Sequence, residues 1–376
     1  MARVIVIGFR RWSAWNLGPV LRAETAPVTF VRDVAAARAL RPGPQDRILV
    51  WGAGAPVGLD DLIATSGARL VRIEDGFIRS VGLGSDLIPP RSLVFDGCGI
   101  YFDATRASGL ENLLATGTFD AALCARAAAL RAMIVARGLT KYNVEDPDPP
   151  TWDAGGRPVL LVPGQVETDA SIALGTQDPG GRTVRTNHAL LAAARTARPD
   201  AFVVYKPHPD VMSGNRRGRL AEAEALRMAD HVETRASIIA CLARSDEVHT
   251  ITSLAGFDAL LRGVPVVTWG VPFYAGWGLT DDRAHDHPAW ARRGRRLTLD
   301  ALTAAALLLY PRYWDPLAGD FTTAEAAIAA IASERDRLRA SAAPDRLMRG
   351  FWRRQLRKVR VLVRAACADK GPLGRY

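Results

Sequence analysis

The sequence predicts an α/β protein with two Rossmann-type, doubly wound domains that face a cleft, followed by C-terminal helices. Three observations predict this fold. Short apolar segments rich in β-branched residues alternate with alanine-rich segments, which is the pattern of parallel strands joined by helices. A stretch rich in proline, glycine and aspartate, residues 143–157, divides this alternation into two halves. The 376 residues suit two domains better than one, since a domain takes roughly 150 residues.

The alternation divides the chain into four parts. We expect residues 1–142 to form the N-terminal Rossmann-like domain and residues 158–320 to form the second one. Residues 143–157 are the expected linker between them. Residues 321–376 should form C-terminal helices that end in a basic amphipathic tail.

The N-terminal half begins with a short buried strand. A segment that reads as a loop or a helix start, Gly8–Asn16, follows this strand and carries two arginines, Arg10 among them. The strands expected in this half are Arg3–Gly8, Arg47–Gly52 and Arg69–Ile73, and the helix is Ala121–Arg137. Alternation of this kind predicts a parallel sheet with helices on both faces.

The second half repeats the alternation without a visible sequence repeat. An alanine-rich helix over Thr323–Ser341 is expected after it. In chain order, the expected elements of the second half are Pro158–Val162, a helix over Asn187–Thr196, Ala201–Tyr205, Ala236–Ala243, Glu247–Ile251, a helix over Leu254–Leu261, and Val264–Trp269.

The basic charge of the chain is concentrated near its C-terminus. The formal net charge is +10, and eight lysines and arginines between Arg346 and Arg364 stand without an acidic residue. The rest of the chain therefore carries about +2 (10 − 8), which argues against a nucleic-acid-binding body. No apolar run approaches the ~18–20 residues of a membrane span or forms a signal-peptide core. We expect a cytoplasmic protein, at most peripheral at the inner membrane.

An apolar stripe runs through the basic tail. Met348, Trp352, Leu356, Val359 and Val363 follow one another at steps of three or four residues, so a helix would collect them on one side between flanking arginines. Such a helix can lie on an anionic membrane surface. It can equally pack back on the body of the protein, and the pattern fits both alternatives.

Two acidic residues end the third expected strand. Glu74 and Asp75 can accept hydrogen bonds from hydroxyl groups or act as a base, while Gly82 and Gly84 let a backbone approach a ligand closely. The simpler interpretation is a strand end capped by an Asp-Gly turn. On the residues alone the simpler interpretation prevails, because the glycine spacing matches neither a Walker loop nor a dinucleotide fingerprint.

A second polar cluster follows the first strand of the second half. Gln165, Glu167, Asp169 and Ser171 fall in one short loop. Asp169 can simply cap a helix that begins at Ala170. The cluster is denser than capping requires, which favours a carboxylate acting as a nucleophile or as the electrostatic partner of an oxocarbenium-like centre.

The next expected strand runs directly into Lys206-Pro-His-Pro-Asp210. The prolines restrict the backbone, so Lys206 and His208 are presented with little conformational entropy left to lose. A lone histidine is usually structural, but a histidine between two prolines at a strand end rarely has a packing reason. The pattern suits the binding of a phosphate group.

A fourth polar cluster, made of hydroxyls, precedes the expected helix at Leu254. Thr250, Thr252 and Ser253 can join the free amides of this helix start in an anion site, although an ordinary Ser/Thr cap explains them too. The aromatic residues and glycines of Gly270–Thr280 then suit the wall of a base or sugar site.

Metal ligation finds little support in the sequence. Asp146 and Asp148 lie in the proline-rich linker, and His285 and His287 lack the helical spacing of two ligands on one face. We therefore predict no obligatory metal and no cofactor.

Taken together, these motifs resemble the bacterial capsular polysaccharide synthesis family of the KpsC and KpsS type, whose members are retaining β-Kdo glycosyltransferases. The sequence around Asp169 looks closest to that of a single module of the tandem KpsC proteins. The resemblance covers most of the chain, and its motifs are Glu74-Asp-Gly-Phe-Ile-Arg-Ser80, Gly164-Gln-Val-Glu-Thr-Asp-Ala-Ser-Ile172, Tyr205-Lys-Pro-His-Pro-Asp-Val211, Thr252-Ser-Leu-Ala-Gly-Phe257, Pro272-Phe-Tyr-Ala-Gly-Trp-Gly-Leu-Thr280 and Tyr310-Pro-Arg-Tyr313.

This resemblance implies a GT-B fold and a transfer reaction. Residues 1–142 would be the acceptor domain, and residues 158–320 the domain of the nucleotide-sugar donor. CMP-Kdo is the implied donor, and a lipid-linked acceptor that carries phosphatidylglycerol or Kdo is the implied acceptor. The implied setting is the synthesis of the capsular polysaccharide linker, with a capsule synthesis or export complex as a partner.

The family motifs also imply roles for individual residues. Asp169 looks like the carboxylate that forms a covalent Kdo adduct, and Glu74 and Asp75 look like catalytic polar residues on the acceptor side. Arg79, Lys206 or Arg10 would hold the carboxylate of Kdo. The residues implied in donor binding are Gln165, Ser171, Lys206, His208, Thr252 and Ser253, with His208 and Ser253 at the phosphate.

Two other functions stay open. One is a GT-B transferase that uses another nucleotide-activated donor in surface polysaccharide synthesis. The other is a non-catalytic capsule export scaffold, against which the intact Asp169, His208 and Ser253 argue. A hydride-transferring Rossmann enzyme is disfavoured because no GxGxxG motif follows the first strand.

Overall fold

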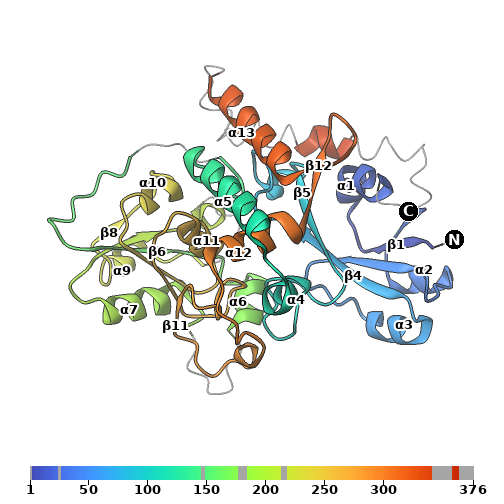
Figure 1. Cartoon of the computed structure of the whole chain (residues 1–376), viewed down its shortest axis with the longest axis horizontal. Helices are drawn as coiled ribbons and strands as arrows, with labels where there is room; N and C mark the ends of the chain where they lie inside the picture. The colour runs from blue at the N-terminus through green and yellow to red at the C-terminus, as the bar shows by residue number, and fades with distance from the viewer. Residues whose placement is uncertain are drawn as a thin grey trace. The chain divides into compact units, whose positions relative to one another are not determined.

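The computed structural model describes residues 2–23, 27–144, 149–176, 184–212, 218–340 and 358–363. These residues form two compact units, each built on its own sheet (Figure 1). The N-terminal unit comprises the described part of Met1–Ile100, Leu139–Val144 and the described residues from Leu307 onward. The second unit comprises Tyr101–Gly138 and the described part of Glu145–Ala306. The prediction of two doubly wound α/β units is confirmed, and both units differ from the continuous ranges expected for the domains.

The N-terminal unit has a mixed, seven-stranded sheet in the order β13-β12-β5-β4-β3-β1-β2. Strands β1 to β4 are parallel, and β5, β12 and β13 continue the sheet in antiparallel pairs. The strands are β1 (Val4–Ile7), β2 (Val28–Val31), β3 (Arg47–Trp51), β4 (Arg69–Asp75), β5 (Ser92–Asp96), β12 (Pro311–Asp315) and β13 (Asp320–Thr322), and the helices are α1 (Arg11–Ala23), α2 (Val34–Ala39), α3 (Leu59–Ser66), the short η1 (Gly84–Asp86) and α13 (Ala324–Ala340).

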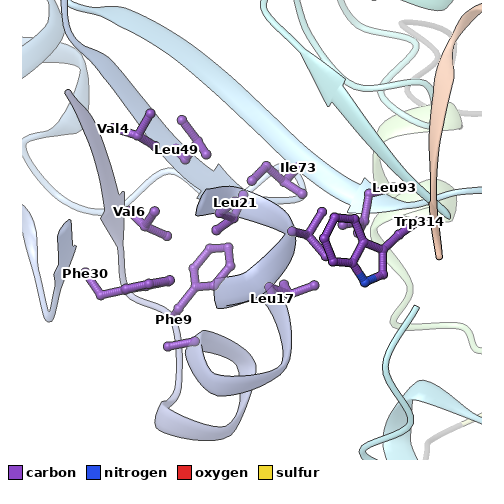
Figure 2. Packing of buried hydrophobic residues seen from close by; sticks show 12 residues of the cluster. Val4, Val6, Phe9, Leu17, Leu21, Phe30, Leu49, Ile73, Leu93 and Trp314 are labelled. Atoms are coloured by element: carbon purple, nitrogen blue, oxygen red, sulfur yellow. The ribbon is translucent and has the colours of Figure 1, made fainter. Parts of the chain in front are cut away.

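Helices cover both faces of this sheet because its strands are apolar on both sides. Val4 and Val6 of β1 point to one face, where they pack with Leu17 and Leu21 of α1 (Figure 2). The alternate residues of β1 point to the other face and pack with residues of α2 and α3. Successive side chains of a strand alternate between its faces, so a strand of four β-branched residues can be buried on both.

Strand β12 returns from the far end of the sequence to the N-terminal sheet. It pairs with β5 in the register Pro311↔Val94, and the backbone N of Trp314 donates to the backbone O of Arg91 at 2.8 Å. The Trp314 ring is buried in the same core as α1 and packs edge-on against Phe321 at 5.5 Å. Helix α13 follows and packs against β12. These contacts place the end of the expected range 158–320 in the N-terminal unit.

The second unit has a six-stranded sheet in which every neighbouring pair is parallel. Its order is β11-β10-β9-β6-β7-β8, so the chain fills one half of the sheet first and then the other. The strands are β6 (Val159–Pro163), β7 (Phe202–Lys206), β8 (His231–Val232), β9 (Glu247–Thr250), β10 (Val266–Thr268) and β11 (Asp281–Asp282).

The helices of the second unit include two that precede β6 in the sequence. Helix α5 packs against α12, and Arg131 of α5 reaches Asp300 of α12 at 3.1 Å. This contact explains why Tyr101–Gly138 belongs to the second unit. The helices are α4 (Gly109–Thr116), α5 (Ala121–Ala136), α6 (Ala170–Gly175), α7 (Asn187–Ala197), α8 (Pro209–Met212), α9 (Glu222–Ala225), α10 (Ile238–Leu242), α11 (Leu254–Leu261), η2 (Pro288–Arg292), α12 (Leu299–Thr303) and η3 (Ala304–Leu309), which crosses into the N-terminal unit.

Most of the predicted amphipathic tail lies outside the described residues. Residues 358–363 are helical, and Lys358 lies 3.5 Å from Asp86 of the same unit. This contact agrees with the alternative in which the tail packs on the body, for these six residues. Within the described ranges, no helix combines the length and apolar character that crossing a membrane demands.

We predict that Trp314→Ala destabilises the whole N-terminal unit, because a large ring is removed from its core. Such losses cost ~3–5 kcal/mol. Hydrogen exchange read by mass spectrometry should show faster exchange in peptides of β1 and β3, more than 250 residues away in the sequence, with peptides of β6 and β9 unchanged.

The exposed Leu317 in the turn between β12 and β13 provides a matched control. Leu317→Ala should leave the exchange of both units unchanged. If Trp314→Ala sped up exchange only in residues 311–322, this would contradict a core shared by Trp314, β1 and β3.

Candidate functional site

The strand order of the second sheet reverses between β6 and β9. The connections that leave these neighbouring parallel strands turn to opposite sides of the sheet, and a crevice is expected at their carboxyl ends at such a reversal. Residues 164–169 follow β6, and residues 251–253 follow β9. Ligands of open parallel sheets bind at such a reversal. Three of the predicted donor-binding residues, Gln165, Ser171 and Thr252, are joined there by hydrogen bonds.

Gln165 connects the two segments across the reversal. Its amide oxygen accepts a hydrogen bond from the backbone N of Thr252 at 2.9 Å, and its amide nitrogen donates to the Thr252 hydroxyl at 3.1 Å. The Thr250 hydroxyl donates to the same amide oxygen at 3.4 Å. Gln165 is buried and both ends of its amide are used, so it fixes the spacing of the two segments. Its contact with a donor stays a prediction.

Asn187, which the sequence analysis did not single out, holds Gln165 in place. Its side chain accepts from the backbone N of Gln165 and donates to the backbone O of Gln165, both at 2.8 Å. The backbone N of Asn187 donates to Glu167 at 2.7 Å. Thr186 already caps α7, so an asparagine directly after it is not needed for capping. That redundancy is the signal that could have identified Asn187.

Ser171 and Asp169 lie at the start of α6. The Thr252 hydroxyl donates to Ser171 Oγ at 3.2 Å. Asp169 Oδ1 accepts from the backbone N of Ser171 at 2.9 Å, which confirms the capping interpretation. Asp169 is nevertheless exposed, and its Oδ2 accepts no hydrogen bond from any residue that the structure describes. The helix start therefore orients this carboxylate and leaves one oxygen available.

Lys206 ends β7, the neighbour of β6, and is buried. Its Nζ donates to the backbone O of Ala236 at 2.6 Å. Burial alone would raise the pKa of Glu233 nearby, but hydrogen bonds from the backbone N of Ala236 and Arg235, with the charges of His231 and Lys206, hold that pKa below its ordinary value. The hydrogen bond from Lys206 thus connects the end of β7 to the segment that follows β8. The contact of Lys206 with a donor or its carboxylate stays a prediction.

His208 follows Lys206 and leads into α8. Its backbone O accepts hydrogen bonds from the backbone N of Val211 and of Met212, both at 3.0 Å. The side chain is half-buried at the carboxyl end of β7. The structure thus places His208 at the expected edge of the sheet, and its phosphate contact stays a prediction.

Ser253 caps α11, as the simpler interpretation of its motif has it. Its Oγ accepts from the backbone N of Ala255 at 3.2 Å, and its backbone N donates to the Thr250 hydroxyl at 3.1 Å. The Tyr274 hydroxyl donates to the backbone O of Ser253 at 2.5 Å. Burial raises the pKa of Tyr274 well above its ordinary value, so this hydroxyl keeps the proton that it donates.

The aromatic rings of the Gly270–Thr280 loop are buried. Tyr274 and Trp277 expose none of their surface and Phe273 exposes 6%. Phe273 packs against Phe257 of α11 at 5.2 Å. The expectation that these rings wall a base or sugar site is therefore wrong, because a ring without exposed surface cannot stack on a ligand.

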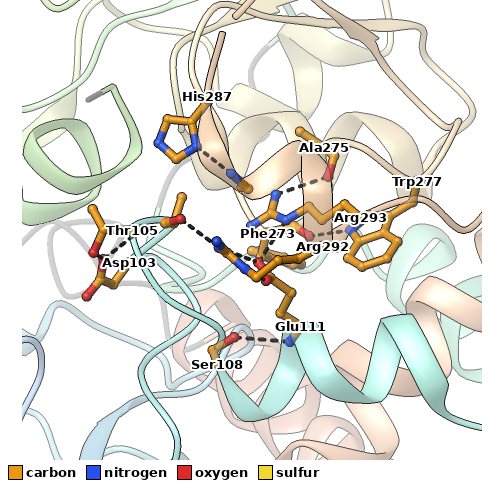
Figure 3. A network of polar contacts seen from close by, with 12 residues as sticks. Asp103, Thr105, Ser108, Glu111, Phe273, Ala275, Trp277, His287, Arg292 and Arg293 are labelled. Atoms are coloured by element: carbon orange, nitrogen blue, oxygen red, sulfur yellow. Dashed lines mark hydrogen bonds and ion pairs between the residues drawn. The ribbon is translucent and has the colours of Figure 1, made fainter. Parts of the chain in front are cut away.

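An ion-pair network that the sequence analysis missed fixes this loop (Figure 3). Glu111 of α4 accepts from Arg292 at 2.5 Å and from Arg293 at 2.9 Å. Arg293 in turn donates to the backbone O of Pro272 at 2.7 Å and of Ala275 at 3.0 Å. Burial lowers the pKa of Arg293, and the charge of Glu111 opposes this effect. The acid and the base are 182 residues apart, so the sequence gives no signal of their pairing.

In the N-terminal unit, Asp75 and Arg79 form a buried ion pair. Asp75 Oδ2 lies 2.6 Å from Arg79 Nε. The other nitrogens of Arg79 donate to Ser80 Oγ at 2.9 Å and to the backbone O of Ile88 at 2.8 Å. Arg79 is thus committed to the loop that follows β4, and its contact with a substrate carboxylate stays a prediction.

The glycines of this loop make room for the protein's own side chains. Gly82 has a φ of +124°, and a Cβ there would lie 2.8 Å from Ile88. A Cβ at Gly84 would lie 3.1 Å from Arg79. The sequence suggested that these glycines let a ligand approach the backbone closely. In the structure the side chains of Ile88 and Arg79 occupy that space.

The remaining predicted residues of the N-terminal unit lie at the carboxyl ends of its strands. Glu74 is half-buried and accepts from the backbone N of Asp75 at 3.0 Å. Arg10 is exposed and directly precedes α1. Their roles toward a substrate stay predictions. Across the described ranges, no three His, Cys, Asp or Glu side chains gather in a way that could hold a metal ion.

Comparisons with known proteins agree over most of the chain. A family model described as "Capsule polysaccharide biosynthesis protein" matches residues 46–150 and 150–313. The capsule polysaccharide modification protein LipA of Neisseria meningitidis serogroup A is 38% identical over 361 residues, which are 96% of this chain and 49% of LipA. The lipopolysaccharide-processing protein LpsZ of Rhizobium meliloti is 40% identical over 76% of this chain and 64% of its own. The chain thus spans about half the length of LipA.

Two solved structures are similar to the whole fold. The KpsC β-Kdo 2,7 transferase of Thermosulfurimonas dismutans has a TM-score of 0.71 and 34% identity, and the match covers 89% of this chain and 99% of that one. The KpsC β-Kdo 2,4 transferase of the same organism has a TM-score of 0.73 and 32% identity, with 87% and 97% covered. The fold is therefore GT-B-like, as the family resemblance implied.

We predict that Gln165→Ala loosens the crevice of the second sheet. The change removes the acceptor of the Thr252 backbone N and the amide group that donates to the Thr252 hydroxyl, a loss of ~1–3 kcal/mol. Hydrogen exchange of residues 250–253 should become at least several-fold faster. The exposed Gln45 offers a matched control, since Gln45→Ala removes the same group without a buried bond. Unchanged exchange of residues 250–253 in Gln165→Ala would show that the bridge is dispensable.

Proposed function

The chain belongs to the capsule polysaccharide biosynthesis protein family, and we propose that it is a retaining glycosyltransferase that moves Kdo from CMP-Kdo to a lipid-linked acceptor. The observation that carries the proposal is the similarity to two KpsC β-Kdo transferases over nearly their full length. The crevice of the second unit supports it, because its polar residues lie where open parallel sheets bind nucleotides. The acceptor that we propose ends in phosphatidylglycerol or in Kdo.

Asp169 is the proposed nucleophile. Its exposed carboxylate has one oxygen held by the start of α6 and the other available for attack. In the first step this oxygen bonds to the anomeric carbon of Kdo, and the bond from that carbon to the CMP phosphate breaks. In the second step an acceptor hydroxyl bonds to the anomeric carbon, the bond from that carbon to Asp169 breaks, and the hydroxyl proton passes to solvent. Two inversions give net retention, as in retaining glycosidases.

The donor would lie across the carboxyl ends of β6, β7 and β9. We assign its phosphate to His208 and Ser253, and its sugar to the half-buried hydroxyls of Ser171 and Thr252. Gln165 and Lys206 are buried, and they support these groups from beneath. Glu74 and Asp75 are assigned to the acceptor. No cofactor or metal takes part in this scheme.

The proposed setting is the cytoplasmic face of the inner membrane, where a lipid-linked acceptor is found. Basic residues of the C-terminal tail would meet anionic lipid there, and a capsule synthesis or export complex would take the product onward.

A transfer assay tests the proposal. CMP-Kdo is generated in situ and offered with a synthetic, lipid-like acceptor that ends in Kdo, and the product is read by mass spectrometry and NMR. One added Kdo with a β linkage would establish donor, reaction and retention together. No product, with CMP still raising the thermal unfolding temperature, would favour another CMP-sugar or acceptor. Neither product nor CMP binding would favour another donor class or a non-catalytic scaffold.

We predict that Asp169→Asn lowers kcat at least ~10³-fold, because the amide cannot form the glycosyl ester. Asparagine is as good a helix cap as aspartate, so folding and CMP binding should persist. Asp120 caps α5 and is equally exposed, so Asp120→Asn makes the same change away from the crevice and should keep full activity. Activity of Asp169→Asn within tenfold of the parent would remove Asp169 from the catalytic role.

A further inference from the structure

Trp51 is a part-exposed ring at the carboxyl end of β3. The N-terminal sheet reverses its strand order between β1 and β3, so Trp51 lies at the reversal in this unit as Gln165 does in the other. Its side chain is 38% exposed. Phe9, which follows β1 and is buried, packs edge-on against the indole at 5.9 Å. The indole is therefore supported on one side and open on another.

The backbone around Trp51 is held by a buried arginine. Arg72 of β4 donates to the backbone O of Gly52 at 3.0 Å and of Gly54 at 2.8 Å. The backbone N of Gly52 donates to the backbone O of Ile73 at 2.8 Å. These bonds hold the turn that directly follows Trp51. Together with Phe9 they preorganise the ring, which lowers the entropic cost of binding.

Polar residues lie at the carboxyl ends of both strands that flank β3. Trp51 pairs in register with Ile73, and Asp75 lies two residues further along that strand on the same face. Asp75 Oδ2 is taken by Arg79, but Asp75 Oδ1 is buried and accepts no hydrogen bond within the described part of the chain. A buried acceptor of this kind calls for a donor. Arg10, exposed just after β1, adds a guanidinium group.

We propose that Trp51 is the stacking platform for the terminal sugar of the acceptor, an acidic pyranose. One face of a pyranose ring presents C–H groups that pack on an indole, while its hydroxyls point outward. Asp75 Oδ1 accepts from one of these hydroxyls, and Arg10 pairs with the sugar carboxylate. The inference rests on the proposed function, because it takes the substrate to be a saccharide acceptor.

The chemistry of the three groups favours this ligand over a lipid. An isolated exposed indole needs no explanation. An indole held in one orientation, with a buried carboxylate oxygen and a guanidinium group at the ends of the two flanking strands, matches an apolar face, a hydroxyl donor and an anion on one small ring. A lipid tail would leave Asp75 Oδ1 without a donor.

The test compares Trp51→Ala and Trp51→Phe in the transfer assay. The Ala variant should raise the acceptor KM at least tenfold, and the Phe variant should raise it less than threefold because it keeps an aromatic face. CMP should raise the unfolding temperature of both variants as it does in the parent. Leu317→Ala, which removes an exposed apolar side chain of the same unit, should leave the acceptor KM unchanged. An unchanged acceptor KM in Trp51→Ala, or equal losses in both variants, would overturn the platform.

A binding experiment separates this inference from the proposed function. Saturation-transfer NMR with the full chain and no donor should show contact with a Kdo methyl glycoside in the parent, weaker contact with a neutral methyl hexoside, and loss of contact in Trp51→Ala. If the parent transfers Kdo but Trp51→Ala keeps its NMR contact with the glycoside, the proposed function is retained and the stacking platform is rejected. If Trp51→Ala loses this contact but the parent forms no product in the transfer assay, the stacking platform is retained and the Kdo transferase activity is rejected. No contact in the parent would reject the platform outright.

Discussion

The candidate site of the second unit depends on one side-chain amide. Gln165 joins the segment after β6 to the segment after β9, and those segments belong to strands that the chain visits almost 90 residues apart. Both hydrogen-bonding groups of the amide are used, so the crevice has a fixed width. Asn187 holds the backbone of Gln165 from behind, which makes the bridge rigid at both ends. The hydroxyls of Thr252 and Ser171 take their positions from it.

Charged groups in both units support the loops that line the strand ends. In the second unit, Glu111 and Arg293 hold the backbone of the aromatic loop, and Tyr274 connects that loop to the cap of α11. In the N-terminal unit, Arg79 holds the loop after β4. Each charge is buried and paired, because an isolated charge in the interior would be very costly. Motif residues such as Arg79 and Tyr274 therefore support the backbone of the loops. The proposed ligand contacts fall to exposed or half-buried groups such as Asp169 and Thr252.

The two sheets apply one physical rule with different residues. Each reverses its strand order, and each places polar or aromatic groups at the carboxyl ends beside the reversal. In the second unit these are hydroxyls, an amide and an exposed carboxylate, which suit a nucleotide sugar. In the N-terminal unit they are an indole, a guanidinium group and a carboxylate oxygen, which suit a saccharide. The proposed division into a donor site and an acceptor site rests on the chemistry of these groups.

The sequence by itself determined the strands β1, β3, β4, β6, β7, β9 and β10, the two-unit α/β fold and the location of the polar clusters, because alternating burial and strand-end polarity are local patterns. It did not predict β2, β5, β8 or β11 to β13. Helices such as Leu254–Leu261 are found where the sequence predicts them. Tertiary structure decided the rest. Neither the return of Trp314 to the first sheet nor the pairing of Glu111 with Arg293 has a local signal, since each depends on contacts between residues far apart. Tertiary packing likewise decided that Trp277 is buried and Trp51 is exposed.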